Sequence, residues 1–172
     1  ALPHNGAARA DGENMVANEE ERESRMNVSK AALIVIDVQV RLVPAMAGFD
    51  KVQENLLRLL NAGSLMGVPT LISEQYPAGL GPTIAPLKQA AGDAVYLEKR
   101  SFAVGDDASS EGLETFLANR SKPDILISGS EAHVCVLQTA LKLIEAGHQV
   151  RLIADACASR TPENHALALS RA

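Results

Sequence analysis

The amino-acid sequence predicts an α/β fold, a three-layer, doubly wound (Rossmann-like) parallel sheet with helices on both faces. Three observations lead to this prediction. Short apolar runs of strand length alternate with amphipathic helical segments from residue 26 onward. The first apolar run, residues 31–38, is almost uninterrupted, which suits a strand buried on both faces. With 172 residues, 47% of them hydrophobic and 22% charged, the chain suits one globular domain.

Each element has its own signal. Strands are expected at the apolar runs of residues 31–38, 68–73, 94–99, 124–129 and 149–157. Helices are expected at residues 51–66, 111–119 and 132–146. Asp50 is a suitable N-cap and Gly67 a suitable stop for the first helix, and Thr161 followed by Pro162 predicts the start of a last helix. Residues 74–86 are rich in Gly and Pro and are expected to form a connecting loop.

Charge and cysteine content exclude several classes of function. The net charge is -5, and the first 25 residues hold six acidic residues against three arginines, so neither nucleic acid nor a membrane is an expected partner. No apolar segment approaches the roughly 18 residues needed to span a bilayer. Two cysteines are too few for a disulfide scaffold. We therefore expect a protein of the reducing cytoplasm.

The composition of the chain changes at about residue 26. Residues 1–25 show little apolar periodicity and are expected to be a flexible acidic N-terminal extension. Residues 26–172 are expected to form a single domain with an aliphatic core, because Trp is absent and aromatic residues make up only 3% of the chain. The stretch GLGPTI, residues 79–84, places proline where a dinucleotide-binding fingerprint needs its helix to begin. No cofactor is therefore expected.

Three residues that could do chemistry fall at the carboxyl ends of expected strands, where sites form in doubly wound sheets. Asp37 ends the first strand, Lys99 ends the third, and Cys135 begins the helix after the fourth. Each alone has an ordinary structural explanation, since strand-end acids cap turns, lysines are solvated and free cysteines are small core residues. Their common placement favours a joint chemical role.

A cysteine nucleophile explains this combination. A helix N-terminus and the Lys99 ammonium are expected to lower the pKa of the Cys135 thiol from roughly 8.5 toward neutrality. Asp37, desolvated in a pocket, suits the acceptance and return of the thiol proton. Backbone N–H groups between Gly129 and Cys135 would face a developing oxyanion. A serine nucleophile is not favoured, because GSEAH at residues 129–133 lacks the second glycine of a nucleophile elbow.

Three separated segments resemble one family. They are LIVIDVQ (residues 33–39), LEKRSF (residues 97–102) and SGSEAHVCVLQTALKLIEAGHQVRLIADACASR (residues 128–160). All three closely resemble the isochorismatase-like hydrolases, also called cysteine hydrolases, in their isochorismatase-domain-containing branch. The resemblance runs from residue 31 to the end of the sequence and implies the family's doubly wound parallel sheet of six strands.

The resemblance also implies the site. The family's catalytic Asp, Lys and Cys fall on Asp37, Lys99 and Cys135. A non-proline cis peptide bond before the cysteine falls on Ser130–Glu131, and the oxyanion hole would use the N–H groups of Glu131 and Cys135. The candidate pocket-lining residues are Gln75, Tyr76, Phe102, His133 and Val134.

No metal site is implied. Nicotinamidase-type members of the family hold a metal through one Asp and two His between the first two strands, and residues 50–73 contain no histidine. No two of the four histidines in the chain have a helical metal-ligand spacing.

The resemblance, with Cys135 retained, implies hydrolysis of a small amide-like, non-peptide C–N bond in a small-molecule substrate. Two alternatives stay open: an isochorismatase-type vinyl ether hydrolase, and a catalytically idle, oligomeric binding module with the same fold. Thiol redox sensing is less favoured, because no resolving cysteine lies near Cys135 in the sequence. Cys157, at the end of the last expected strand, is expected to be a buried structural thiol.

The chain departs from the family pattern at its end. The final family strand is absent from the given sequence, so either the sequence is a fragment or the edge of the sheet is covered differently, as by a partner subunit. On the second explanation we expect a homo-oligomer. Near the same edge, Asp155 and Arg160 are expected to pair with each other or to cap the last strand.

Overall fold

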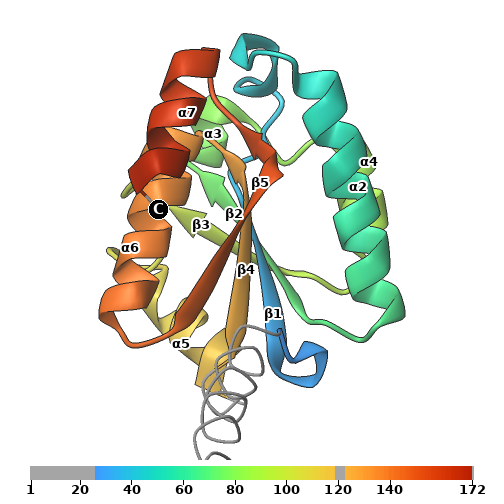
Figure 1. Cartoon of the computed structure of the whole chain (residues 1–172), viewed down its shortest axis with the longest axis vertical. Helices are drawn as coiled ribbons and strands as arrows, with labels where there is room; N and C mark the ends of the chain where they lie inside the picture. The colour runs from blue at the N-terminus through green and yellow to red at the C-terminus, as the bar shows by residue number, and fades with distance from the viewer. Residues whose placement is uncertain (1–25, 119–122, 172) are drawn as a thin grey trace, which may run out of the picture.

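A single all-parallel sheet organises the chain (Figure 1). The computed structural model describes residues 26–118 and 123–171, so the expected extension of residues 1–25 lies outside the described residues. The sheet has five strands in the order β3-β2-β1-β4-β5. Their bounds are β1 (Ala31–Ile36), β2 (Thr70–Gln75), β3 (Val95–Lys99), β4 (Asp124–Ser130) and β5 (Gln149–Ala158). The predicted three-layer, doubly wound fold class is confirmed.

Helices cover both faces of the sheet. On one face lie α2 (Phe49–Leu65) and α4 (Ala85–Ala90), and on the other lie α5 (Ser110–Ala118), α6 (Leu137–Glu145) and α7 (Pro162–Arg171) (Figure 1). Two short 3-10 turns, η1 (Val28–Lys30) and η2 (Val43–Ala45), flank β1. None of the helices in the described ranges is both long and apolar enough to cross a membrane.

The core has two halves, one on each face of β1. Leu33 and Val35 pack with the α2 side, whereas Ile34 and Ile36 pack with the α6 side, because successive residues of a strand point to opposite faces. All six residues of β1 are fully buried. This explains why residues 31–36 form an uninterrupted apolar run.

Two local predictions were wrong. Residues 74–86 are not a plain loop, because they contain α3 (Pro77–Leu80) and the start of α4, each with proline in its first turn, where the missing N–H costs nothing. Asp50 is not an N-cap, because α2 already begins at Phe49, after Gly48 with φ +60°. Asp50 lies instead in the first turn, where its negative charge interacts favourably with the positive end of the helix dipole.

The order of the strands reverses beside β1. β1 pairs with β2 on one side and with β4 on the other, and in register Ile36 lies between Ser73 and Gly129. The chain runs outward from β1 through β2 to β3, and then returns to place β4 and β5 on the opposite side. A ligand crevice in such a sheet forms at the carboxyl ends of the two strands that flank this reversal. Asp37 follows one of these strands and Glu131 follows the other.

β1 and β4 approach each other unusually closely at Gly129. This residue has φ +117°, and a Cβ placed there would lie 2.1 Å from the backbone oxygen of Ile36 and 2.6 Å from its nitrogen. No side chain fits at that distance from rigid backbone atoms. Glycine therefore allows the turn after β4 to lie directly against the residue that follows β1.

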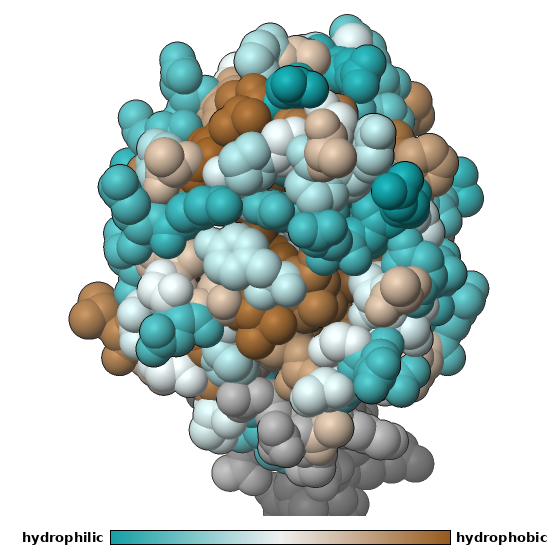
Figure 2. Space-filling model, turned by 180° about the vertical axis from the view of Figure 1, so that it is seen from behind, coloured by the Kyte–Doolittle hydropathy of each residue, from teal (hydrophilic) through white to brown (hydrophobic). Residues whose placement is uncertain are grey.

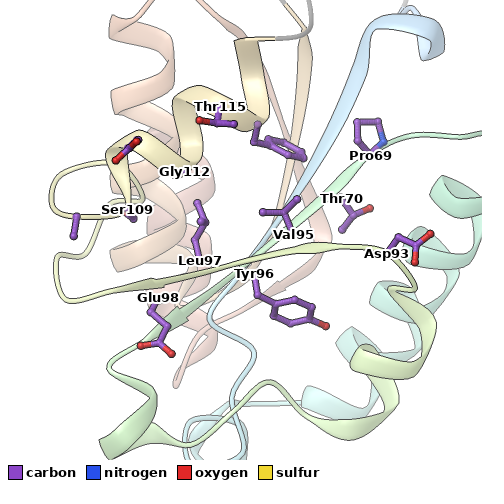
Figure 3. Close-up of a pocket in the computed structure, with 13 residues that line it drawn as sticks. Pro69, Thr70, Asp93, Val95, Tyr96, Leu97, Glu98, Ser109, Gly112 and Thr115 are labelled. Carbon is purple, nitrogen blue, oxygen red and sulfur yellow. The ribbon is translucent and has the colours of Figure 1, made fainter.

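The outer edge of the sheet at β3 is apolar and exposed. Val95 and Tyr96 keep 42% and 39% of their surface exposed, and a groove of about 770 Å³ between β3 and α5 is lined by Leu97 and Phe116, among others (Figure 3). The view from behind shows a hydrophobic hollow framed by hydrophilic residues on this side of the molecule (Figure 2).

Candidate active site

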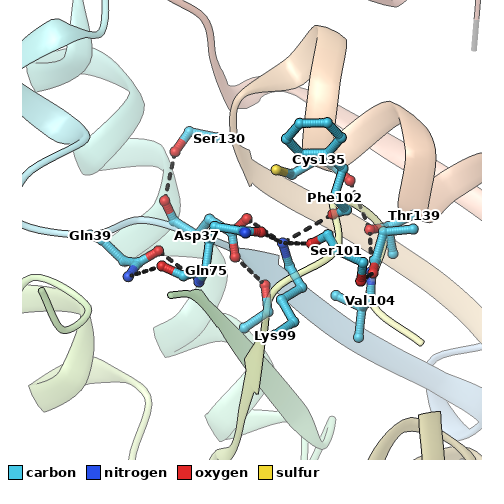
Figure 4. Close-up of polar contacts among 12 residues, drawn as sticks. Asp37, Gln39, Gln75, Lys99, Ser101, Phe102, Val104, Ser130, Cys135 and Thr139 are labelled. Atoms are coloured by element: carbon cyan, nitrogen blue, oxygen red, sulfur yellow. Dashed lines mark hydrogen bonds and ion pairs between the residues drawn. The ribbon is translucent and has the colours of Figure 1, made fainter. Parts of the chain in front are cut away.

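Asp37, Lys99 and Cys135 come together at the strand reversal (Figure 4). Asp37 follows β1, Lys99 is the last residue of β3, and Cys135 lies in η3 (Ala132–Val136), a π-helical turn that leads into α6. The Lys99 Nζ lies 2.7 Å from Asp37 Oδ2, and both side chains are completely buried. Because β2 separates β3 from β1, only a long side chain at residue 99 can reach Asp37. Cys135 keeps 8% of its surface exposed.

The backbone and both carboxylate oxygens of Asp37 are held in place. Its φ is +48°, a conformation that costs about 1 kcal/mol or more outside glycine and is found at functional sites. The Asp37 N–H donates to the Ser73 carbonyl at 3.1 Å, and the Ser130 hydroxyl donates to the Asp37 carbonyl at 2.8 Å. The Ser73 hydroxyl also donates to Oδ1 at 2.7 Å, while Lys99 occupies Oδ2. The carboxylate is therefore fixed in one orientation.

The Lys99 ammonium is saturated with acceptors. They are Asp37 Oδ2 at 2.7 Å, Gln75 Oε1 at 2.7 Å, the Phe102 carbonyl at 3.0 Å and the Ser101 carbonyl at 3.2 Å. An ammonium has three hydrogens, so each of them already has an oxygen partner. These contacts replace the water that the completely buried side chain cannot reach.

The pKa that we expected for Cys135 was wrong in direction. Burial, and then the negative charge of Asp37, raise the pKa of the Cys135 thiol to about 12, and Lys99 opposes them only in part. The pKa of Cys157 is also raised to about 12, mainly by burial. Cys135 is therefore a thiol at rest, and it needs a base such as the adjacent carboxylate to become a nucleophile. Its pKa does not distinguish it from Cys157, which is a buried thiol as expected.

The turn before Cys135 is anchored at both ends. The Ser130–Glu131 peptide bond is cis, at the position that the resemblance implied. The Glu131 carboxylate lies 3.1 Å from Arg160 Nε, so the expected pairing of Arg160 with Asp155 was wrong. These contacts tie the turn after β4 to the end of β5.

The helix expected at residues 132–146 does not begin as an α-helix. In η3 the Val136 N–H reaches back five residues to the Glu131 carbonyl at 3.2 Å. The Thr139 hydroxyl donates to the Cys135 carbonyl at 2.7 Å, a side-chain bond that competes with the regular helix ladder. The same hydroxyl accepts the Val104 N–H at 3.1 Å, which links the cysteine turn to the segment after Lys99.

Asp107, which the sequence analysis did not identify as a site residue, organises the segment that follows Lys99. Its carboxylate accepts the N–H groups of Arg100, Ser101 and Ser109. Burial raises the pKa of Asp107, but these backbone bonds and the Ser109 hydroxyl outweigh burial and hold the pKa well below its usual range. The carboxylate thus shapes the loop whose carbonyls reach Lys99.

Three of the candidate pocket-lining residues, Gln75, Tyr76 and Phe102, differ in their exposure and in their contacts. Tyr76 is 45% exposed, carries the Arg100 guanidinium 4.9 Å from its ring centre, and lines a hollow of about 290 Å³ beside Lys99. Gln75 does not line this hollow, because its side chain is bonded to Lys99 and to the Arg100 carbonyl. Phe102 is 61% exposed and is drawn beside Cys135 in Figure 4.

His133 and Val134 lie in η3, directly before Cys135. Both are half-buried. The His133 Nδ1 lies 3.1 Å from the hydroxyl of Ser159, a buried residue just after β5, so this ring is held against the end of the sheet. Over residues 26–118 and 123–171, no three His, Cys, Asp or Glu side chains gather closely enough to hold a metal ion.

Comparisons with known proteins identify the family. The isochorismatase domain model matches residues 31–172. Isochorismatase domain-containing protein 2 of Danio rerio is 33% identical over 148 residues, which cover 86% of this chain and 72% of that protein, and protein 2A of Mus musculus is 34% identical, with 86% and 68% covered. The solved structure of the MAR1 ribonuclease from Caenorhabditis elegans has a TM-score of 0.77 and 31% identity, and covers 86% of this chain and 74% of that one. The chain belongs to the isochorismatase family.

Proposed function

We propose that this protein with an isochorismatase-family hydrolase fold is a cysteine hydrolase that cleaves a small amide-like, non-peptide C–N bond. The observation that carries the proposal is the coupling of one thiol to a completely buried ion pair. The Cys135 thiol interacts with both Asp37 and Lys99, which lie 2.7 Å apart. A buried charge pair is costly unless it is well bonded, and here it stands beside a potential nucleophile at the strand reversal.

In the proposed first half-reaction, Asp37 accepts the proton of the Cys135 thiol while the sulfur attacks a carbonyl carbon. A C–S bond forms, and the carbonyl π electrons move onto oxygen. The N–H groups of Glu131 and Cys135 would stabilise this oxyanion. When the intermediate collapses, the C–N bond breaks and Asp37 returns the proton to the leaving amine.

In the second half-reaction, water hydrolyses the thioester. Asp37 takes one proton from the water as its oxygen attacks the acyl carbon, and the departing sulfur receives that proton when the carboxylic acid leaves. Lys99 donates to four oxygens and takes no part in the proton transfers. Asp37 is thus the group that moves protons, and Lys99 supplies a fixed positive charge beside it.

Other functions receive less support from the site. Vinyl ether hydrolysis can proceed without a cysteine nucleophile, and it would leave the coupling of Cys135 to the ion pair without a purpose. The nematode neighbour is described as a ribonuclease, but a net charge of -5 does not favour binding of a polyanion. A catalytically idle module would not need the fully bonded Asp37 and Lys99.

The proposal is tested by trapping the acyl group on the enzyme. The full chain is incubated with a panel of small amides, quenched in acid and analysed by peptide mass spectrometry. We expect an acyl mass increment on the Cys135 peptide for at least one amide, and none on the Cys157 peptide. Cys157 is a matched internal control, because it is as buried and has a similar pKa. A folded chain that is acylated by no amide in the panel, or equally on both cysteines, would contradict the proposal.

We further propose that the protein is a homo-oligomer, supported by the exposed apolar edge at β3. Sedimentation velocity should show a species larger than the monomer, and Val95→Lys on β3 should shift it toward monomer. Leu65→Lys is the matched control, because Leu65 is 89% exposed at the end of α2. A monomeric wild type, or equal effects of the two variants, would contradict this arrangement.

We also propose that residues 26–172 form one catalytic domain, that its substrate is a small molecule and that the protein is cytoplasmic. The hollow of about 290 Å³ beside Lys99 is not itself the proposed substrate site, because neither Asp37 nor Cys135 lines it.

A further inference from the structure

We propose that Gln75 is a positioning residue of this site, whose side-chain oxygen holds the Lys99 ammonium against Asp37 and competes with the Cys135 thiol for its hydrogens. The inference rests on the proposed cysteine hydrolase function, which it deepens. It concerns the state of the site before substrate binds.

The amide of Gln75 has only one orientation that satisfies its surroundings. Its Nε2 donates to the Arg100 carbonyl at 2.8 Å, which leaves Oε1 facing Lys99 Nζ at 2.7 Å. The reversed amide would point N–H groups at an ammonium and an oxygen at a carbonyl. Gln75 therefore presents a fixed acceptor to Lys99.

The backbone of Gln75 is clamped by a second glutamine. Gln39 is completely buried, and its Oε1 accepts the Gln75 N–H at 2.8 Å. Its Nε2 donates to the Gln75 carbonyl at 3.0 Å and to the Gly81 carbonyl at 2.6 Å. Because Gln39 lies two residues after Asp37, the position of Gln75 is tied to the loop that carries the carboxylate.

These contacts determine where the positive charge of Lys99 is directed. Asp37, Gln75 and the carbonyls of Ser101 and Phe102 engage all three hydrogens of the ammonium. The Cys135 sulfur must compete with four oxygens for these hydrogens, so Lys99 lowers the pKa of the thiol by less than burial and the charge of Asp37 raise it. The thiol thus stays protonated until Asp37 takes its proton.

The Gln75 amide carries no charge, and this matters as much as its position. Gln75 holds the ammonium without cancelling its positive charge, so the charge is available to a thiolate once Asp37 has become neutral by taking the proton. A carboxylate at residue 75 would attract the ammonium more strongly and would repel a thiolate. A side chain without an acceptor would leave three oxygens to compete with the sulfur for the three hydrogens, and the interaction of Lys99 with the thiol would strengthen.

Two substitutions at Gln75 should therefore act in opposite directions on Cys135. In Gln75→Leu the weaker competition for the Lys99 ammonium should raise the thiolate fraction at a fixed pH about tenfold. Because a more acidic thiolate is a weaker nucleophile, the rate of alkylation by iodoacetamide should rise about threefold. In Gln75→Glu the rate should fall about threefold below wild type.

The experiment measures the alkylation rate of Cys135 by peptide mass spectrometry, together with the ultraviolet absorbance of thiolate as a function of pH. The absorbance readout is insensitive to access of the reagent. Cys157 serves as an internal reference, and Gln89→Leu makes the same exchange at an exposed position of α4. Gln75→Glu is nearly the same size as wild type and carries the test by itself if thermal melting shows that Gln75→Leu does not fold.

Rates in the two Gln75 variants that change in the same direction, or that stay within twofold of Gln89→Leu, would overturn the inference. Failure of the proposed function gives a different pattern, because wild-type Cys135 would then form no acyl adduct while the two variants still diverge in alkylation.

Discussion

Replacing Lys99 by methionine is expected to lower the free energy of unfolding by about 3–5 kcal/mol, because the change leaves one buried charge without its partner. Methionine fills the volume of the lysine stem but cannot donate to Asp37, whose side chain has no exposed surface. The Ser73 hydroxyl is then the main remaining donor to that carboxylate. Urea unfolding of the variant and the wild type measures the difference.

The destabilisation should depend on the charge of the partner. The double variant Lys99→Met with Asp37→Asn buries no charge and should recover much of the lost stability. A deficit that is not relieved in the double variant would show that the lysine acts by packing alone.

A surface ion pair provides the matched control. Lys142 Nζ lies 2.6 Å from Asp106 Oδ1, as close as the buried pair, but the two side chains are 37% and 50% exposed. Solvent screens such a pair, so Lys142→Met should cost less than about 1 kcal/mol. Equal losses at Lys99 and Lys142 would mean that burial is not what makes the catalytic pair costly to break.

The parts of the fold that follow from simple patterns could be predicted from the sequence. The apolar run that ends at Asp37 reflects a strand covered on both faces, and the alternation of strands and helices leaves few topologies. The carboxyl ends of parallel strands lie at one edge, so Asp37, Lys99 and the start of the Cys135 helix could be expected near one another.

Contacts that depend on single polar residues could not be predicted. Ser73, Gln75 and Asp107 sit at a strand end or in a loop where many polar residues occur, and no periodicity distinguishes them. The lack of a sequence signal for these polar residues also explains why the expected direction of the Cys135 pKa shift was wrong. Lys99 does lower the pKa of the thiol, but burial and the negative charge of Asp37 outweigh it, and the sequence does not show that Gln75 and two carbonyls compete for the same ammonium.

The second large effect is expected for Asp37→Asn. In the proposed mechanism Asp37 moves every proton, and the loss of a general acid–base residue typically costs 10²–10⁴-fold in rate. Acylation of Cys135 by an amide that labels the wild type should slow by about that factor. Lys99 keeps Gln75 and the carbonyls of Ser101 and Phe102 as acceptors, so this variant should still fold, which thermal melting checks.

The thiol should nevertheless become more acidic in the same variant. Asp37 contributes to the raised pKa of Cys135, and Lys99 opposes that rise. Asparagine removes the negative charge and weakens the hold on the ammonium, so the pKa of the Cys135 thiol should fall below its wild-type value of about 12. A pH titration of thiolate absorbance, with Cys157 as the reference thiol, measures this change.

In Asp37→Asn, the acylation rate of Cys135 should fall while its thiolate fraction rises. These opposite changes would distinguish a catalytic base from a residue with only a structural role. A variant with more thiolate and slower acylation shows that thiolate formation alone does not drive the reaction, because the leaving amine still lacks its proton donor. If acylation instead became faster along with the thiolate fraction, Asp37 would be an inhibitor of the thiol rather than its base. If neither readout changed in a folded variant, the ion pair would have no part in the chemistry of Cys135.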